Sequence, residues 1–166
     1  MVTESQLSKL MAELADLLTA RAYKMASAES CTGGWLAKAA TDLAGSSGWF
    51  DRGLVTYSNQ AKHEVLAVSE STLDQYGAVS QETVHEMVAA LLSVKSVSLG
   101  VAISGIAGPG GGSADKPVGT VWLAWKMLQQ PIISKRYNFK GDRQQVRLQA
   151  TIEAVAGLIS LLKSHQ

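Results

Sequence analysis

The chain has 166 residues, a length that suits one domain with a sizeable core, and we expect residues 1–166 to fold as a single domain. Hydrophobic residues make up 46% of the sequence and charged residues 17%, which favours a compact soluble protein and excludes a disordered one. The formal net charge of +1 gives no reason to expect nucleic-acid binding or attraction to a membrane surface.

No segment has the pattern of a membrane span or of a signal peptide. Apolar runs such as Val88–Leu92 are too short to cross a bilayer. The residues from Met1 to Glu4 lack a charged region followed by an apolar one. A single cysteine, Cys31, excludes an internal disulfide and suits a reducing compartment, so we expect a cytoplasmic protein.

The first part of the chain predicts helices around two short strands. Thr3 and Gln6 form a capping box, and the apolar residues behind them share one face, which predicts a helix over about 4–21. The other elements expected here are a strand over Met25–Glu29, a helix from near Gly33 to the break at Gly45–Gly48, a strand over Phe50–Tyr57 and one helical turn over 61–66.

The second part predicts a central strand, a hairpin and two longer helices. Ser80 is a good N-cap for a helix whose buried stripe ends near Leu92. Large and small residues alternate from Val97 to Ile103, as in a central strand with a helix close to one face. The remaining elements are strands over Gly119–Met127 and Ile132–Phe139, and a long final helix behind a capping box of Asp142 and Gln145.

Helices that flank and alternate with about five strands predict an α/β protein. We expect a three-layer α/β/α sandwich with a mixed sheet, because short connections between such elements place helices on both faces.

The junction between the first strand and the second helix, Ala28–Gly34, carries the strongest chemical signal. Such a junction lifts one side chain, here Ser30, clear of the sheet, and it points the free N–H groups of the new helix at whatever Ser30 attacks. A nucleophile and an oxyanion site can therefore come from one turn. From this motif alone, the favoured alternative is that Ser30 or Thr32 is an ordinary N-cap.

The turn itself contains no base for Ser30. Glu29 is adjacent, but successive strand residues point to opposite faces. Cys31 is a rival nucleophile at a helix N-terminus, although a lone cysteine is more often a small buried hydrophobe. The three histidines and the cysteine lack metal-ligand spacing, so we expect no metal site. We also expect no cofactor.

Candidate partners for Ser30 follow the second strand. Tyr57 and Lys62 would lie beside the end of the first strand if the two strands are parallel neighbours. Either group can act as a base where burial or a neighbouring charge lowers its pKa from about 10. The alternative is an edge tyrosine and a solvated lysine.

A glycine-rich loop, Ser104–Gly112, follows the central strand. Its composition favours close backbone approach to a ligand, with N–H groups available for an anion. It is not a Walker A loop, because Ser113 stands where lysine is needed. Arg143 and Arg147 share one face at the start of the final helix, which hints at a phosphate or carboxylate ligand. A flexible crossover and two solvated arginines are the alternatives.

Six segments together resemble the CinA C-terminal domain family. They are Ala28–Gly34, Gly53–Asn59, Gly77–Ser80, Ser104–Gly112, Lys116–Val121 and Gly141–Arg143, and they occur in the family's order across nearly the whole chain. The resemblance implies a three-layer α/β/α fold, no metal and a homodimer or higher homo-oligomer. It implies hydrolysis of the carboxamide of nicotinamide mononucleotide to nicotinic acid mononucleotide and ammonia.

The resemblance also assigns residues by position. Ser30 would be the nucleophile, Tyr57 and Lys62 its activating partners, and the turn at Cys31, Thr32 and Gly33 the oxyanion site. The substrate-binding residues expected are Gly34, Asn59, Ser104, Gly105, Gly108 and Arg143. A non-catalytic nucleotide-binding module of the same fold remains the alternative. A hydrolase of the penicillin-recognising type is disfavoured, because Gly33 stands three residues after Ser30 where that class has lysine.

Overall fold

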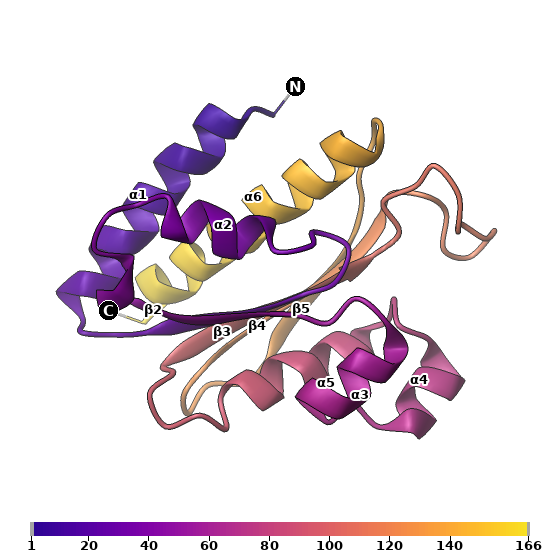
Figure 1. Ribbon diagram of the computed structural model, residues 1–166, viewed down its shortest axis with the longest axis horizontal. Coiled ribbons are helices and arrows are strands. Elements are labelled where there is room, and N and C mark those ends of the chain that lie inside the picture. The colour runs from indigo at the N-terminus through magenta and orange to yellow at the C-terminus, as the bar shows by residue number, and fades with distance from the viewer. Residues whose placement is uncertain (1, 166) are drawn as a thin grey trace.

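The computed structural model describes residues 2–165 and has a five-stranded sheet between two layers of helices (Figure 1). In chain order the elements are α1 (Glu4–Ala20), β1 (Met25–Glu29), α2 (Trp35–Thr41), the 3-10 turn η1 (Ser46–Gly48), β2 (Phe50–Val55), α3 (Asn59–Leu66), α4 (Glu70–Tyr76), α5 (Gln81–Leu91), β3 (Leu99–Gly105), β4 (Thr120–Met127), β5 (Ile133–Asn138) and α6 (Arg143–Ser164). None of the helices within residues 2–165 combines the length and the apolar character that crossing a membrane requires.

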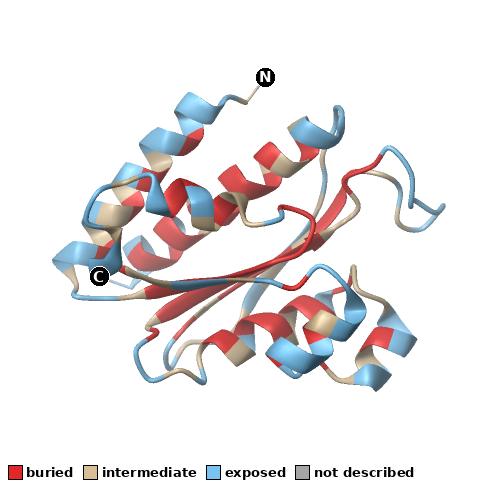
Figure 2. Ribbon diagram, viewed as in Figure 1, coloured by how far each residue is buried: buried red, intermediate tan, exposed pale blue. Residues whose placement is uncertain are grey.

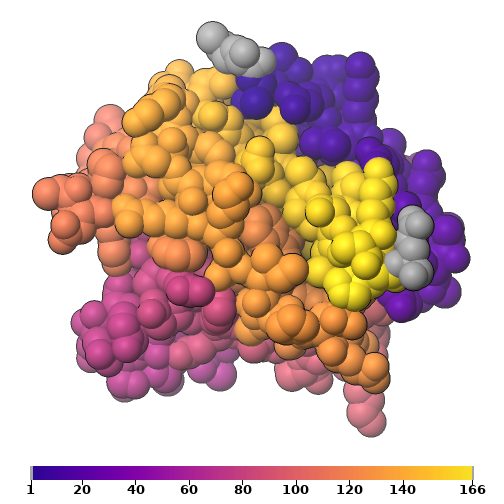
Figure 3. All heavy atoms as spheres, turned by 180° about the vertical axis from the view of Figure 1, so that it is seen from behind, coloured from indigo at the N-terminus to yellow at the C-terminus, as the bar shows by residue number. Residues whose placement is uncertain are grey.

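The strands run in the order β2-β1-β3-β4-β5, and the sheet is mixed. β1 pairs in parallel with β2 and β3, whereas β4 pairs antiparallel with β3 and β5. α1, α2 and α6 cover one face and α3, α4 and α5 the other (Figure 1). Seen from behind (Figure 3), the orange and yellow segments from β4 to α6 occupy the middle of the molecule. The predicted α/β/α sandwich is confirmed.

The core consists of two apolar clusters, one on each face of the sheet, and Figure 2 shows the buried residues along the sheet and on the inner sides of the helices. The alternation predicted for β3 is confirmed. Its large residues, such as Val101 and Ile103, pack against α1 and α6, while Ala102 packs on the α5 side. On that side Gly100 lies in contact with Leu91, because only a residue without a side chain lets α5 approach so closely.

The predicted caps are present. Thr3 accepts a hydrogen bond from the Gln6 backbone N–H, and Asp142 accepts one from Gln145. Several boundaries differ from the predictions; for example, α2 begins at Trp35 rather than near Gly33, and β2 ends at Val55 rather than at Tyr57. The single turn expected over 61–66 is the eight-residue helix α3. α4 was not predicted, because Leu73 is its one buried residue and a single apolar position gives no helical period.

Gly157 tests the packing of α6 on the sheet. Alanine usually stabilises a helix interior by about 1 kcal/mol relative to glycine. Here a Cβ atom would overlap the indole ring of Trp125, and a hydrogen bond from Nε1 of Trp125 to the Ala154 carbonyl holds that ring in place. We expect Gly157→Ala to lower the free energy of unfolding by about 1–3 kcal/mol in urea titrations, as overpacking does.

Gly48 supplies the control for that prediction. Nothing lies within 4 Å of the position that a Cβ would take there, so Gly48→Ala should leave stability unchanged or raise it slightly. Equal stability of Gly157→Ala and the wild-type protein would contradict the packing described for α6 and β4.

The topology brings three strand ends to one edge of the sheet. In the parallel register Glu29 lies opposite Val55 of β2 and Ile103 of β3. The segments that follow these strands therefore start side by side, at the carboxyl edge where open α/β sheets bind ligands. The condition stated for Tyr57 and Lys62, that the first two strands are parallel neighbours, is confirmed.

Candidate active site

Ser30 lies immediately after β1, at the start of a tight turn. Its backbone N–H donates to the Ile103 carbonyl at 2.9 Å, which ties the turn to β3. Gly33 and Gly34 then adopt positive φ angles of 62° and 93°, a region that residues with side chains rarely enter. The chain reverses over these residues and enters α2, and the Ser30 side chain is left beside α3.

The Glu29 side chain holds the turn and the start of α2 together. Its buried carboxylate accepts hydrogen bonds from the hydroxyls of Ser27 and Thr32 and from the backbone N–H groups of Gly34, Leu36 and Ala37, at 2.7–3.2 Å. The N-terminus of α2 is therefore capped by Glu29, and the alternative of Ser30 or Thr32 as N-cap is wrong. Sequence reasoning considered Glu29 only as a base. The sequence signal for this capping role was the position of Glu29, an acidic residue shortly before a helix N-terminus.

Lys62 points its amine at Ser30. The Lys62 Nζ atom lies 3.0 Å from Ser30 Oγ, and it donates to the backbone carbonyls of Thr56 at 2.9 Å and Tyr57 at 3.3 Å. The side chain is 1% exposed, and within residues 2–165 it forms no ion pair. Burial lowers the pKa of Lys62 from its ordinary value of 10.5.

These contacts allow Lys62 to act as a base in its neutral form. A neutral lysine has two N–H bonds and one lone pair, and two carbonyls and one hydroxyl surround Nζ. If the two N–H bonds donate to the carbonyls, the lone pair faces the Ser30 hydroxyl and can accept its proton. The geometry is that of a nucleophile and its base.

The backbone N–H groups of Cys31 and Thr32 have no acceptor in the part of the chain that the structure describes. The groups that follow are occupied, because Gly33 N–H donates to the Ser30 carbonyl and Gly34 N–H to Glu29. The first N–H groups of α2, expected to stabilise an oxyanion, are thus taken up by the Thr32 carbonyl and by Glu29. Cys31 and Thr32 remain available for that role, and Gly33 does not.

Cys31 is not set up as the nucleophile. Its side chain is 6% exposed, and burial raises the pKa of the thiol to about 11. The thiolate is the reactive form of cysteine, so a thiol with this pKa is unreactive near neutral pH.

Tyr57 differs from its expected role. Its side chain is 59% exposed, and its hydroxyl accepts a hydrogen bond from Arg143 at 2.8 Å. Because β2 ends at Val55, Tyr57 lies beyond the strand and turns toward the start of α6. Tyr57 therefore contributes its backbone carbonyl, not its hydroxyl, to the Ser30–Lys62 pair.

The other expected binding residues are only partly brought together. Arg143 donates to the Gly108 carbonyl at 2.8 Å and so joins the glycine-rich loop to Tyr57. The Ser104 hydroxyl donates to the Ala78 carbonyl, and Gly105 lies against the backbone of β4. These contacts within the fold explain why serine and glycine occupy the two positions. Asn59 is exposed at the start of α3.

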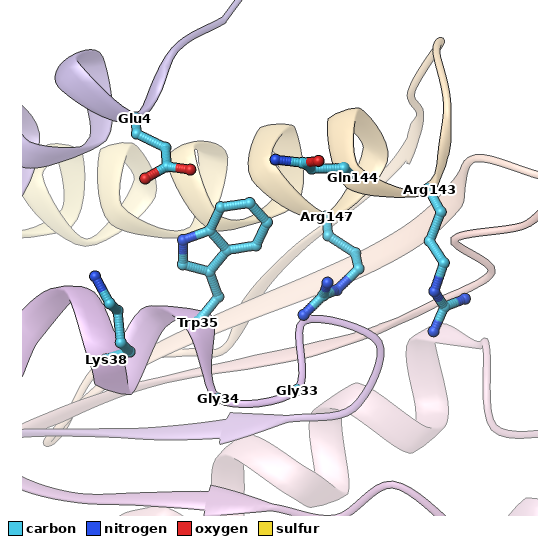
Figure 4. Close-up of a pocket in the computed structure, with 8 residues that line it drawn as sticks. All are labelled: Glu4, Gly33, Gly34, Trp35, Lys38, Arg143, Gln144 and Arg147. Atoms are coloured by element: carbon cyan, nitrogen blue, oxygen red, sulfur yellow. The ribbon is translucent and has the colours of Figure 1, made fainter.

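A cavity of about 590 Å³ opens on the α6 side of the turn (Figure 4). It is lined by Glu4, Gly33, Gly34, Trp35, Lys38, Arg143, Gln144 and Arg147. Arg147 extends from α6 toward the turn, Arg143 extends to one side of it, and Trp35 lies between α2 and α6 (Figure 4). Lys38 is paired with Asp42, so two arginines face the one carboxylate of the lining, and this balance favours an anionic ligand. Across residues 2–165, no group of three or more histidine, cysteine, aspartate or glutamate side chains is arranged to hold a metal ion.

A buried serine–lysine pair beside two unused backbone N–H groups, on an α/β/α sandwich, is an arrangement suited to acyl transfer. Residues 7–162 match the family model of the CinA C-terminal domain, and the chain belongs to that family.

Relatives and solved structures agree with this assignment. The chain is 54% identical to the nicotinamide-nucleotide amidohydrolase PncC of Enterobacter agglomerans, over 91% of this chain and 92% of that protein. It is 50% identical to the protein of the same name from Escherichia coli K12, over 95% of each. The competence damage-inducible protein A structure from Klebsiella pneumoniae superposes with a TM-score of 0.92 at 41% identity, over 96% of this chain and 99% of that one. The chain is an amidohydrolase.

Proposed function

We propose that the chain hydrolyses the carboxamide of nicotinamide mononucleotide to nicotinic acid mononucleotide and ammonia, with Ser30 as the nucleophile. The names of the relatives support the substrate. The observation that carries the mechanism is the 3.0 Å contact between Lys62 Nζ and Ser30 Oγ in a buried site. Amide hydrolysis through a serine needs a base at this position.

In the first half of the reaction, neutral Lys62 takes the proton from the Ser30 hydroxyl. The oxygen attacks the carboxamide carbon, and the electron pair of the C=O bond moves to its oxygen. The N–H groups of Cys31 and Thr32 stabilise this oxyanion, and each well-placed donor contributes about 3 kcal/mol. As the C–N bond breaks, protonated Lys62 returns its proton to the leaving nitrogen, which departs as ammonia.

In the second half, water replaces ammonia. Neutral Lys62 takes a proton from water, which attacks the ester carbon on Ser30 through the same oxyanion site. Breaking the ester bond releases the carboxylic acid, and the proton on Lys62 returns to Ser30.

Side-by-side ammonia release from nicotinamide mononucleotide, nicotinamide riboside and free nicotinamide tests the proposal. We expect the highest kcat/KM for the mononucleotide. Binding of the mononucleotide in a calorimeter without ammonia release would contradict the proposal and favour the non-catalytic nucleotide-binding module.

Arg143 supplies a prediction about the phosphate. It uses two of its five N–H donors on Gly108 and Tyr57, so three remain for a substrate anion. A hydrogen bond to a charged group contributes about 1.5–3 kcal/mol, so Arg143→Met should raise the KM for the mononucleotide about 10- to 100-fold. The KM for the riboside, which has no phosphate, should change little. Arg136→Met, which removes an exposed arginine of β5, is the control.

Three further expectations complete the proposal. The reaction would recycle pyridine nucleotides toward NAD. The protein would act in the cytoplasm, and it would assemble as a homodimer or higher homo-oligomer. Light scattering of the purified protein measures the last of these.

A further inference from the structure

Arg147 reaches from α6 to the back of the Ser30 turn (Figure 4). Its Nε atom donates to the Cys31 carbonyl at 3.0 Å, and Nη2 donates to the Thr32 carbonyl at 2.8 Å. The guanidinium also lies over the Trp35 ring, 5.2 Å from its centre, which restricts its movement. One half-buried side chain therefore holds two consecutive carbonyls of the turn.

Fixing these carbonyls fixes the N–H groups on the opposite side. The peptide bond between Cys31 and Thr32 is trans, and in a trans peptide the C=O and the N–H point in opposite directions. A Cys31 carbonyl directed at α6 therefore turns the Thr32 N–H away from α6. That N–H is one of the two without an acceptor in residues 2–165.

The positive charge of Arg147 also favours the Thr32 N–H as a donor, in addition to orienting it. A cation bound to a carbonyl oxygen polarises its peptide unit and strengthens the donor at the other end, as in chains of hydrogen bonds. Arg147 is the one partner of the Cys31 carbonyl among residues 2–165, whereas the Thr32 carbonyl also accepts from Trp35. The Cys31–Thr32 peptide thus depends on Arg147 alone.

We propose that Arg147 is a positioning residue that orients and polarises the Thr32 N–H toward the oxyanion. The inference rests on the proposed function in taking Ser30 as the nucleophile, and it does not depend on which amide is hydrolysed. Arg147 acts through the peptide that its Nε and Nη2 donors hold at the Cys31 and Thr32 carbonyls.

Steady-state kinetics of Arg147→Met and Arg147→Lys provide the first test. Loss of one oxyanion donor costs about 10²–10³ in kcat, so kcat of Arg147→Met should fall about 100-fold while KM changes less than about threefold. Lysine keeps the charge and can donate to one of the two carbonyls, so kcat of Arg147→Lys should fall less, about tenfold. Arg21→Met is the matched control, because Arg21 bridges the carbonyls of Leu17 and Leu162 away from the site and should keep wild-type kcat.

Labelling of Ser30 by a fluorophosphonate provides a readout without substrate. Ser30 attacks the phosphorus, the P–F bond breaks with release of fluoride, and Lys62 takes the serine proton. The charge that develops on the P=O oxygen uses the same oxyanion site, so labelling measured by mass spectrometry should slow about 100-fold in Arg147→Met. The pH at which labelling reaches half its maximum should stay where it is in the wild-type protein, because Lys62 is untouched. If Arg147→Met does not fold, the predicted tenfold fall in kcat and in labelling rate of Arg147→Lys tests the positioning role instead.

The outcomes separate this inference from the substrate assignment. Wild-type kcat and labelling in both Arg147 variants, or an effect confined to KM, would overturn the positioning role. A wild-type protein that is labelled at Ser30 but releases no ammonia from nicotinamide mononucleotide would refute the substrate alone. Slower labelling in Arg147→Met would then still support the inference.

Discussion

Replacing Ser30 with alanine is expected to abolish ammonia release from nicotinamide mononucleotide, with a fall in kcat on the order of 10⁴-fold or more. The oxyanion donors and the binding residues would remain, but the one hydroxyl that is hydrogen-bonded to Lys62 Nζ in residues 2–165 would be lost, and with it the acyl-enzyme. The single hydrogen-bonded partner of the Ser30 hydroxyl in residues 2–165 is Lys62, so the fold should tolerate the change. An ammonia assay on the purified variant, with circular dichroism to verify folding, measures this.

Cys31→Ala is the matched control for Ser30→Ala. Its thiol is buried with a raised pKa, and the backbone N–H persists in the variant. Most activity should therefore survive. Full activity in Ser30→Ala together with an inactive Cys31→Ala would show that the wrong nucleophile has been assigned.

Lys62→Met should lose about 10²–10⁴-fold in kcat/KM, the contribution typical of a general base. Methionine fills much of the same buried space but can neither accept nor donate a proton. The same variant should be more stable than the wild-type protein at neutral pH, because it removes a lysine whose charged form is disfavoured by burial. Activity and stability should thus change in opposite directions.

The pH dependence follows from the lowered pKa of Lys62. Activity needs the neutral amine, so kcat/KM should rise with pH through a pKa below 10.5. Between that pKa and the unfolded value the unfolded chain binds more protons, so the contribution of Lys62 to stability also rises with pH. The stability advantage of Lys62→Met should be greatest below the folded pKa and shrink toward high pH.

Urea titrations at several pH values measure this advantage. Lys126→Met is the control, because Lys126 is a half-buried lysine that donates to the Gln130 carbonyl away from Ser30. It should show no comparable gain. A stability difference between Lys62→Met and the wild-type protein that does not change with pH would contradict a lowered pKa of Lys62.

Local pattern was sufficient for most of the fold. The alternation along β3 and the caps at Thr3 and Asp142 depend on residues within a few positions of one another, so each could be recognised from the sequence. α4 could not, since it is short and buries only Leu73.

The site depends on contacts that no local pattern contains. Lys62 could be connected to Ser30 only on the condition that β1 and β2 are parallel neighbours. The role of Glu29 depends on how the turn folds back over its carboxylate, and the period of a strand says nothing about that. Arg147 binds carbonyls 115 and 116 residues earlier in the chain, so only the tertiary structure reveals the contact.

The central claim is that Ser30, activated by Lys62, carries the acyl group. Mass spectrometry after a rapid acid quench of the enzyme with nicotinamide mononucleotide tests it most directly. We predict that the peptide containing Ser30 gains the mass of the nicotinic acid mononucleotide acyl group, with the ester on Ser30, and that Ser30→Ala shows no adduct. An adduct on Cys31, or turnover without any covalent intermediate on Ser30, would contradict the account.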